Sequence, residues 1–298
     1  MKENHFVEKG LTIVCILLLV WISIIPSTAQ RIEKSSLATS SGHWLYVGGS
    51  GLGNYTRIQD AINDSDNGDT VYVYDDSSPY HENLVIHQTS LTLLGENKQT
   101  TVLVCKVHEI ENRVIVVGGD FVCISGFTIK EEKFSYLYFS IGANNIQVSD
   151  NIIIGIELVL PAQTYQCKIS NNVIKGNHST EGIHVWGKQN TISDNVITEC
   201  GNGIFVGYGG ISLHVKAYGN IITRNNFLNN KKNAEFDTAW FTRWVNNYWD
   251  DSQEGVNPYE IQGKITFPRG EDKLPWIFDW KNFDRHPAKE PYNISGMS

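Results

Sequence analysis

Four copies of one phrase determine the fold of this chain: Ile146-Gln-Val-Ser-Asp-Asn-Ile-Ile153, Cys167-Lys-Ile-Ser-Asn-Asn-Val-Ile174, Asn190-Thr-Ile-Ser-Asp-Asn-Val-Ile197 and Val215-Lys-Ala-Tyr-Gly-Asn-Ile-Ile222. The Asn before the final apolar pair recurs at intervals of 21, 23 and 25 residues, at Asn151, Asn172, Asn195 and Asn220. A near-constant period of this size is typical of a solenoid, in which each repeat forms one turn and packs on its neighbours.

A second phrase lies within each turn, in Gly155-Ile-Glu-Leu-Val159, Gly182-Ile-His-Val-Trp186 and Gly203-Ile-Phe-Val-Gly207. Each turn therefore holds at least two short β-branched strands separated by Gly, Asn or Asp bends. A leucine-rich repeat would need Leu at many fixed positions, and a hexapeptide β-helix would need a six-residue rhythm, and the sequence has neither pattern. We therefore predict an all-β fold, a single right-handed parallel β-helix with about 22 to 25 residues per coil.

Successive coils of a β-helix lie about 4.8 Å apart, so equivalent residues form columns along its axis. Ile156, Ile183 and Ile204 are expected to form one apolar column. The four Asn residues of the first phrase are expected to form an amide column at a bend, where each amide donates to one neighbour and accepts from the other. Burial of the apolar columns should stabilise the fold more than these hydrogen bonds, each worth about 1 kcal/mol net.

The N-terminal segment has the features of a targeting sequence. Basic residues flank a polar start, Leu11–Ile25 is an apolar run of 15 residues, and small residues follow at the spacing of a cleavage site. We predict a secretory signal peptide over residues 1–29, with a retained membrane anchor as the alternative; the run is shorter than the about 20 residues of a membrane span. Residues 30–43 are Ser-rich and predict a flexible linker, and residues 44–298 are assigned to the β-helix domain.

Both ends of the predicted solenoid should be covered, because an open end exposes apolar core. Residues 55–65 carry apolar side chains on one helical face and predict an N-terminal helical cap. Five tryptophans lie between Trp240 and Trp280 and predict an aromatic C-terminal cap over residues from about 230 to 298. A sugar-stacking platform is the alternative use of this aromatic cluster.

Composition narrows the classes of ligand. The net charge is -8 and the Lys and Arg residues are not clustered, which argues against nucleic acid as a partner. The two Met residues lie at the extreme ends, and no His/Met or Cys/His cluster has ligand spacing, so we predict no metal site and no cofactor. The four cysteines beyond the signal segment are either free thiols or include a bridge between Cys105 and Cys123.

Two segments resemble a known family. Residues 46–62 with the following Asn67-Gly-Asp-Thr-Val-Tyr-Val-Tyr74 resemble the opening of exported right-handed β-helix proteins of the NosD-like, pectin-lyase-type superfamily, and Asn247-Tyr-Trp249 with Pro287-Ala-Lys-Glu-Pro-Tyr292 resembles their usual ending. The resemblance covers nearly all of the mature chain and implies the fold. It does not select a function, because the superfamily contains lyases, glycosidases and adhesins, and the NosD proteins are associated with copper delivery to a periplasmic enzyme.

Asp150 and Asp194 are weak catalytic candidates. They share one repeat position two coils apart, which corresponds to about 9.6 Å. This separation is at the upper end of the about 6.5 to 9.5 Å between the carboxyl groups of inverting glycosidases. Both residues precede the bend Asn, where Asp is an ordinary turn former, so a structural role in the turn is the alternative that we favour.

The second phrase supplies candidate ligand-binding residues. If its apolar residues face inward, then Glu157, His184 and Phe205 lie outward on successive coils, Trp186 stands beside them and Tyr208 borders the group. Aromatic rings with a carboxylate and an imidazole suit a sugar, through stacking and hydrogen bonds. The alternatives are scattered surface residues, an edge covered by a loop, or a catalytic pair that includes Glu157.

We therefore expect an exported, noncatalytic protein that binds carbohydrate or acts as a cell-envelope interaction module, with a polysaccharide or an envelope glycan as its partner. The alternative is a polysaccharide lyase or glycoside hydrolase, and only a lyase would use Ca²⁺ as a cofactor. Copper handling, implied by the resemblance, is a minor alternative. We expect the protein outside the cell or at its surface, or in the periplasm of a host with an outer membrane. Membrane contact is expected only through an uncleaved N-terminal segment.

Overall fold

The computed structural model describes residues 42–107, 112–133, 136–207, 217–252, 258–267, 269 and 275–294. The chain divides into two compact units, residues 1–40 and 41–298. The first unit lies outside the described residues, so the signal peptide over residues 1–29 remains a prediction, as does the linker over residues 30–43 apart from its last two residues. Among the described residues, no helix is long and apolar enough to cross a membrane.

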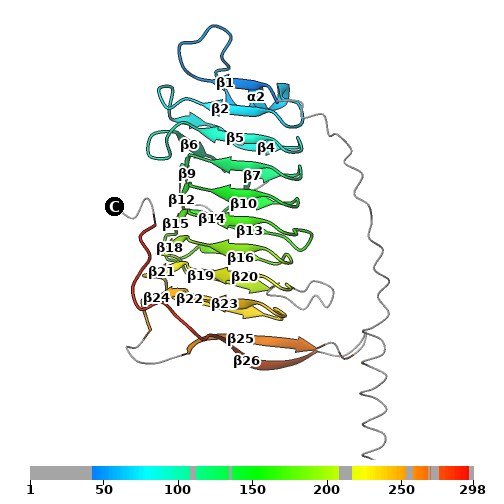
Figure 1. The fold of residues 1–298 in the computed structure, drawn as a ribbon, viewed down its shortest axis with the longest axis vertical. Coiled ribbons are helices and arrows are strands. Elements are labelled where there is room, and N and C mark those ends of the chain that lie inside the picture. The colour runs from blue at the N-terminus through cyan, green and yellow to red at the C-terminus, as the bar shows by residue number, and fades with distance from the viewer. Residues whose placement is uncertain are drawn as a thin grey trace, which may run out of the picture. The chain divides into compact units, whose positions relative to one another are not determined.

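The second unit is a right-handed parallel β-helix, as predicted (Figure 1). Its strands follow one another around three faces, and each strand pairs in parallel with the equivalent strand of the next coil. The first face consists of β1 (Trp44–Val47), β2 (Thr70–Val73), β5 (Thr92–Gly95), β8 (Cys123–Ser125), β11 (Gln147–Ser149), β14 (Lys168–Ser170), β17 (Thr191–Ser193), β20 (Ile221–Thr223) and β23 (Arg243–Val245).

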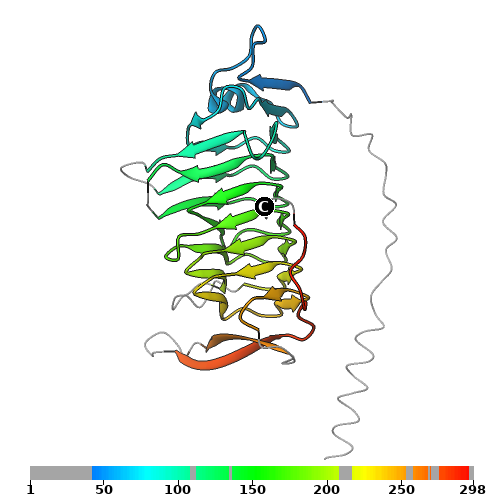
Figure 2. The ribbon, with the colours of Figure 1, turned by 90° about the vertical axis from the view of Figure 1, so that its left-hand side faces the viewer.

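The other two faces are built in the same way, and Figure 2 shows the stack from a second side. The second face consists of β4 (Leu84–Ile86), β7 (Arg113–Val117), β10 (Leu137–Ile141), β13 (Ile156–Leu160), β16 (Glu181–Val185), β19 (Asn202–Gly207), β22 (Lys232–Asp237) and β25 (Tyr259–Phe267). The third face consists of β3 (Tyr80–His81), β6 (Val102–Cys105), β9 (Thr128–Glu131), β12 (Ile152–Ile154), β15 (Val173–Lys175), β18 (Val196–Thr198), β21 (Asn226–Leu228) and β24 (Tyr248–Trp249).

Apolar columns run through the interior where the three faces meet. On the third face from β6 to β24, one buried residue of each strand pairs with its equivalent in the next coil: Leu103, Ile129, Ile153, Ile174, Ile197, Phe227 and Trp249. On the second face, Ile183 pairs with Leu158 and with Ile204. The expected place of Ile156 in this column is wrong, since Ile156 pairs with Leu137.

A ladder of buried Asn side chains runs along the bend between the first and third faces. The backbone N–H of Asn151 donates to Asn172 Oδ1 at 3.0 Å, and that of Asn172 donates to Asn195 Oδ1 at 3.0 Å. Asn195 in turn donates to Asn225 Oδ1, not to Asn220. The predicted place of Asn220 is therefore wrong, because the coil after Asn195 is 30 residues long and a constant period selects the wrong Asn.

Asn220 belongs to a second, shorter ladder one bend away. Its Oδ1 accepts the backbone N–H of Asn190 at 2.9 Å, and Asn190 Oδ1 accepts the backbone N–H of Cys167 at 2.9 Å. Both ladders perform the same task, because they satisfy backbone donors that a tight bend would otherwise leave buried without an acceptor.

Both ends of the solenoid are covered. The helix α2 (Ile58–Asp64) packs its buried residues Ile58, Ala61 and Ile62 on the first coil, and the Glu82 carboxylate accepts the backbone N–H groups at its start. The aromatic C-terminal cap is only partly internal. Trp244 and Trp249 are buried in the last coils, whereas Trp276 and Trp280 on β26 (Trp276–Asp284), which pairs antiparallel with β25, are each 54% exposed.

The four cysteines beyond residue 41 are all free thiols, and a bridge between Cys105 and Cys123 does not form. Three of them are buried, and Cys123 is partly exposed. Burial raises the pKa of the Cys105 thiol to about 12, and it does the same for Cys200. These thiols therefore behave as small apolar core residues, which matches their inward positions.

Candidate functional site

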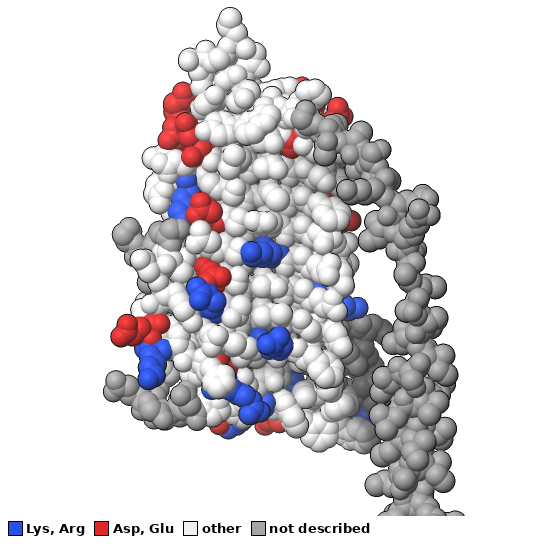
Figure 3. All heavy atoms as spheres, in the orientation of Figure 1, with Lys and Arg blue, Asp and Glu red and all other residues white. Residues whose placement is uncertain are grey.

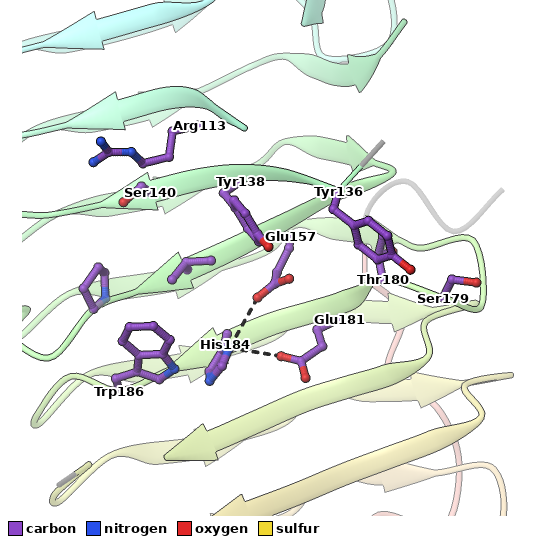
Figure 4. Close-up of a pocket in the computed structure, with 12 residues that line it drawn as sticks. Arg113, Tyr136, Tyr138, Ser140, Glu157, Ser179, Thr180, Glu181, His184 and Trp186 are labelled. Carbon is purple, nitrogen blue, oxygen red and sulfur yellow. Dashed lines mark ion pairs between the residues drawn. The ribbon is translucent and has the colours of Figure 1, made fainter. Parts of the chain in front are cut away.

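An open groove of about 650 Å³ crosses the outer surface of the second face (Figure 4). It passes over four neighbouring strands, β7, β10, β13 and β16, and over the bends that precede and follow them. The lining residues are Arg113, Tyr136, Tyr138, Ser140, Glu157, Val159, Pro161, Ser179, Thr180, Glu181, His184 and Trp186. Three of the five predicted ligand-binding residues, Glu157, His184 and Trp186, therefore share one groove.

The strand register places Glu157 diagonally opposite His184 rather than directly beneath it. Val159 pairs with His184, and Glu157 lies two residues before Val159 on β13, on the same outward side. The two copies of the second phrase are thus offset by two residues, not aligned Gly to Gly as the sequence suggests. Because side chains alternate with a period of two, this offset leaves Glu157 on the outer face, within reach of His184.

Two carboxylates approach one ring nitrogen of His184. The Nδ1 atom lies 3.3 Å from Glu157 Oε1 and 3.1 Å from Glu181 Oε2. The other ring nitrogen, Nε2, lies 3.0 Å from the carbonyl oxygen of Gly207 and donates its proton there. Figure 4 shows both carboxylates directed at the same edge of the imidazole.

The electrostatics of this cluster follow from its burial. Burial lowers the pKa of His184, but the adjacent Glu157 and Glu181 carboxylates outweigh it and raise the pKa to about 9. The pKa of Glu157 is also raised, chiefly because its side chain is buried. When no metal is bound, His184 is therefore a cation at neutral pH, and the carboxyl groups of Glu157 and Glu181 are its partners.

Glu181 is the member of the cluster that the sequence did not reveal. It lies three residues before His184, and in a regular strand that spacing places two side chains on opposite faces. Glu181 begins β16 at a bend and has the parity of the buried residues Ile183 and Val185, yet its side chain lines the groove, so the alternation fails there. No sequence pattern signals such a break.

The other predicted ligand-binding residues occupy different places around the cluster. The rings of Trp186 and Phe205 pack edge to face on His184, with centroids 4.8 and 4.9 Å away. Phe205 is buried and supports the imidazole rather than lining the groove. Tyr208 lies outside the described residues. Tyr136, which the sequence did not indicate, is 60% exposed at the groove edge.

Asp150 and Asp194 lie away from this groove, at the bend that carries the Asn ladder. Both have left-handed backbone conformations, with φ of 58° and 56°. Asp150 pairs with Lys98 Nζ at 2.6 Å, and Asp194 with Arg224 Nε at 2.7 Å. Each carboxylate is thus held by a cation in a turn, an arrangement that supports the structural interpretation of these residues.

The family comparison agrees with the architecture. The model of the family described as periplasmic copper-binding protein (NosD) matches residues 52–264. This chain belongs to the NosD family. A search of curated proteins found no match. Among solved structures, a pectin methylesterase from carrot is similar to this NosD-family chain over 70% of its length and 77% of the esterase, with 10% identity and a TM-score of 0.41.

The family description implies copper, and the Glu157–Glu181–His184 cluster allows the fit to be tested. One imidazole nitrogen and two carboxylate oxygens suit a divalent ion such as Cu²⁺ or Zn²⁺. The same three donors do not suit Cu⁺, which prefers thiolate and thioether ligands. These residues therefore fit the divalent form of the metal. The prediction of no metal site was made without this cluster, because ligand-spacing rules do not detect Glu181, and it stays a prediction.

Proposed function

We propose that this NosD-family protein is exported and binds a glycan in the groove over β7, β10, β13 and β16, without cleaving it. The observation that carries the proposal is the combination of an exposed and a partly buried aromatic ring with paired carboxylates in one open groove. Tyr136 and Trp186 offer flat apolar faces, and Glu157 and Glu181 offer acceptors for hydroxyl groups. This is the composition expected of a site that orients a polar ligand with an apolar ring face.

The shape of the groove supports an extended ligand. It crosses four strands, which corresponds to about 14 Å along the solenoid axis at the spacing of neighbouring strands. The face drawn in Figure 3 shows described Lys and Arg side chains beside Asp and Glu, with most of the described surface uncharged. The groove lining itself combines Arg113 with Glu157 and Glu181, so it presents no positive field and favours a neutral or weakly charged chain over a strong polyanion.

The position of His184 favours binding over hydrolysis. The two carboxylates have oxygens within 4.8 Å of each other, near the about 5 to 5.5 Å between the carboxyl groups of retaining glycosidases. However, the imidazole lies within 3.3 Å of both carboxylates and fills the space that a glycosidic bond would need. A polysaccharide lyase or glycoside hydrolase therefore remains the alternative function, with Glu157 and Glu181 in place of Asp150 and Asp194.

A panel of soluble oligosaccharides, neutral and acidic, tests the proposal. Binding is measured by calorimetry, and the same mixtures are analysed for reducing ends and for unsaturated products. Saturable binding without products supports the proposed function. Release of products that is lost in Glu157→Gln would show an enzyme instead, and failure of every saccharide to bind would remove the glycan from consideration.

Copper handling is the second candidate, favoured by the family description and by the donor set of the cluster. It requires no glycan, so the saccharide panel does not address it. A metal titration addresses it, because a copper-handling protein must bind the ion whether or not a saccharide is present.

A further inference from the structure

We propose that Glu157, Glu181 and the Nδ1 atom of His184 bind a divalent transition-metal ion. The three residues come from β13 and β16 of adjacent coils, and their side chains meet on the outer face of the solenoid (Figure 4). The proposal stands on the geometry of these atoms and does not depend on glycan binding.

Two of the three distances within the cluster are compatible with the edges of a coordination polyhedron. With metal–ligand bonds of about 2.05 Å, neighbouring ligands are about 2.9 Å apart in an octahedron and about 3.4 Å apart in a tetrahedron. The two N···O distances, 3.1 and 3.3 Å, lie between these values. A single charge-assisted hydrogen bond between an imidazolium and a carboxylate is shorter, about 2.7 to 2.9 Å, so the one proton of Nδ1 is shared between two carboxylates. The two carboxylate oxygens lie within 4.8 Å of each other, and rotation of either side chain would bring all three atoms to the spacing of ligands of one ion.

The imidazole is oriented as metal-binding imidazoles usually are. Its Nε2–H donates to the Gly207 carbonyl, so Nδ1 is the nitrogen that would coordinate once an ion displaces its proton. The flanking rings of Trp186 and Phe205 restrict rotation of the imidazole. A ligand held in this way loses little conformational freedom when an ion binds.

Glu181 adds a second observation. Its Oε2 atom is buried, and among the described residues it has the ion pair with Nδ1 at 3.1 Å but no further hydrogen-bond donor. A divalent ion that replaces the proton of Nδ1 would satisfy this oxygen together with the imidazole nitrogen. Two carboxylates with a neutral imidazole also carry the charge that one divalent ion balances.

The donor set selects the class of ion. A mixed set of one nitrogen and two oxygens suits Zn²⁺, Mn²⁺ or Cu²⁺, whereas Ca²⁺ takes about six to eight oxygen ligands. The cluster lines the groove, so the remaining coordination positions face it and are open to water or to a hydroxyl group of a ligand. This is the arrangement of a site with an exchangeable position rather than a closed structural site.

The test is a titration of Zn²⁺ into the protein, purified without a histidine tag and treated with a chelator, followed by calorimetry in the absence of saccharide. We expect one ion per chain. Glu157→Gln, Glu181→Gln and His184→Gln should each weaken binding by at least about tenfold. Glu132→Gln and His81→Gln, which alter the same residue types away from the groove, should leave the affinity unchanged. Ca²⁺ should bind more weakly than Zn²⁺.

A second readout keeps the test decisive if His184→Gln fails to fold. Glu181 is partly exposed, so Glu181→Gln should fold, and circular dichroism checks this. The absorption spectrum of bound Co²⁺ reports whether an imidazole and carboxylates are its ligands, and it should change in Glu181→Gln. Absence of Zn²⁺ binding, or equal Zn²⁺ affinity in the folded Glu181→Gln and unaltered proteins, would overturn the proposal. Either result would leave the glycan proposal untouched.

Discussion

The Asp284 carboxylate terminates the Asn ladder by accepting both amide groups of Asn247. Its Oδ2 atom lies 2.8 Å from the Asn247 backbone nitrogen and 3.1 Å from Asn247 Nδ2. The same oxygen accepts Trp249 Nε1 at 3.3 Å, and Asp284 is fully buried. A chain of amides that all donate in one direction ends on an anion, which is the strongest acceptor that a side chain can provide.

We expect Asp284→Ala to lower the free energy of unfolding by about 3 to 5 kcal/mol, because several buried donors lose their only charged acceptor. Asp284→Asn keeps one acceptor oxygen and should cost about 1 to 2 kcal/mol. Urea denaturation measures the loss of unfolding free energy in both variants. The exposed Asp279→Ala is the control, and its loss should be near zero. Equal losses in Asp284→Ala and Asp279→Ala would show that the ladder end is not stabilising.

Asn172→Ala tests the interior of the ladder. The Asn172 side chain donates to the carbonyls of Val148 and Ser170 and to Asn195, while its oxygen accepts from Asn151. We expect a loss of about 2 to 4 kcal/mol, because buried groups on both neighbouring coils lose partners. The exposed Gln147→Ala should cost less than about 0.5 kcal/mol. An unchanged urea midpoint in Asn172→Ala would contradict the role of the ladder.

The fold could be predicted from the sequence because a β-helix repeats its chemistry along one axis. The repeat period and the bend residues identify the type of fold, but they do not reveal how many extra residues an individual coil contains. The coil between Asn195 and Asn225 is 30 residues long, whereas the next is 22, so a constant period placed Asn220 in the wrong ladder. Register is set by three-dimensional packing, and a local phrase does not contain that information.

A substitution on the groove wall should weaken glycan binding without unfolding the protein. Tyr136 is 60% exposed, so Tyr136→Ala removes a stacking face and little core. We expect about a tenfold loss of affinity, equivalent to about 1.4 kcal/mol. Trp186→Ala should have at least the same effect, since it also releases His184. Affinity is measured by calorimetry with the best saccharide of the panel.

Trp280→Ala is the matched control for these groove variants, because Trp280 is 54% exposed on β26, outside the groove. It should leave saccharide affinity unchanged. If Trp280→Ala abolishes binding while Tyr136→Ala does not, the tryptophan-rich tail is the sugar platform and the groove is not.

Thiol reactivity should follow burial rather than disulfide pairing. Cys123 is partly exposed, whereas Cys105 and Cys200 are buried with pKa values raised to about 12. We expect iodoacetamide to modify Cys123 first in the native protein, because the thiolate is the nucleophile and only an accessible thiol can react. Peptide mapping by mass spectrometry identifies the modified residue. Resistance of Cys123 until a reductant is added would indicate a disulfide.

The residues of the candidate site could be predicted only where side chains alternate regularly between the inner and outer sides of a strand. Glu157, His184 and Trp186 follow the two-residue period of strands, so their outward positions survive even a register offset of two. Glu181 escapes the pattern because it lies at a bend, where it has the parity of the inward Ile183 and Val185 but its side chain reaches the groove. Its proximity to His184 depends on the path of one turn, and sequence spacing alone does not determine that path.

The His184 cluster should make the metal-free protein less stable as pH rises. In the unfolded chain His184 has its ordinary pKa of 6.5, whereas in the folded protein the pKa is about 9. Between these values the folded state holds a proton that the unfolded state has lost. The stabilisation is therefore complete below pH 6.5 and disappears as pH rises through 9. The raised pKa of Glu157 acts with the same sign at lower pH.

The size of this effect follows from the shift in the His184 pKa and amounts to roughly 3 kcal/mol at most. Urea denaturation in the presence of a chelator, at intervals from pH 6 to pH 9.5, measures it. We expect the free energy of unfolding to fall across this range in the unaltered protein and to fall much less in His184→Gln. Parallel curves for the two proteins would mean that His184 does not hold its proton between the carboxylates, because the linkage requires a proton that only the folded state retains.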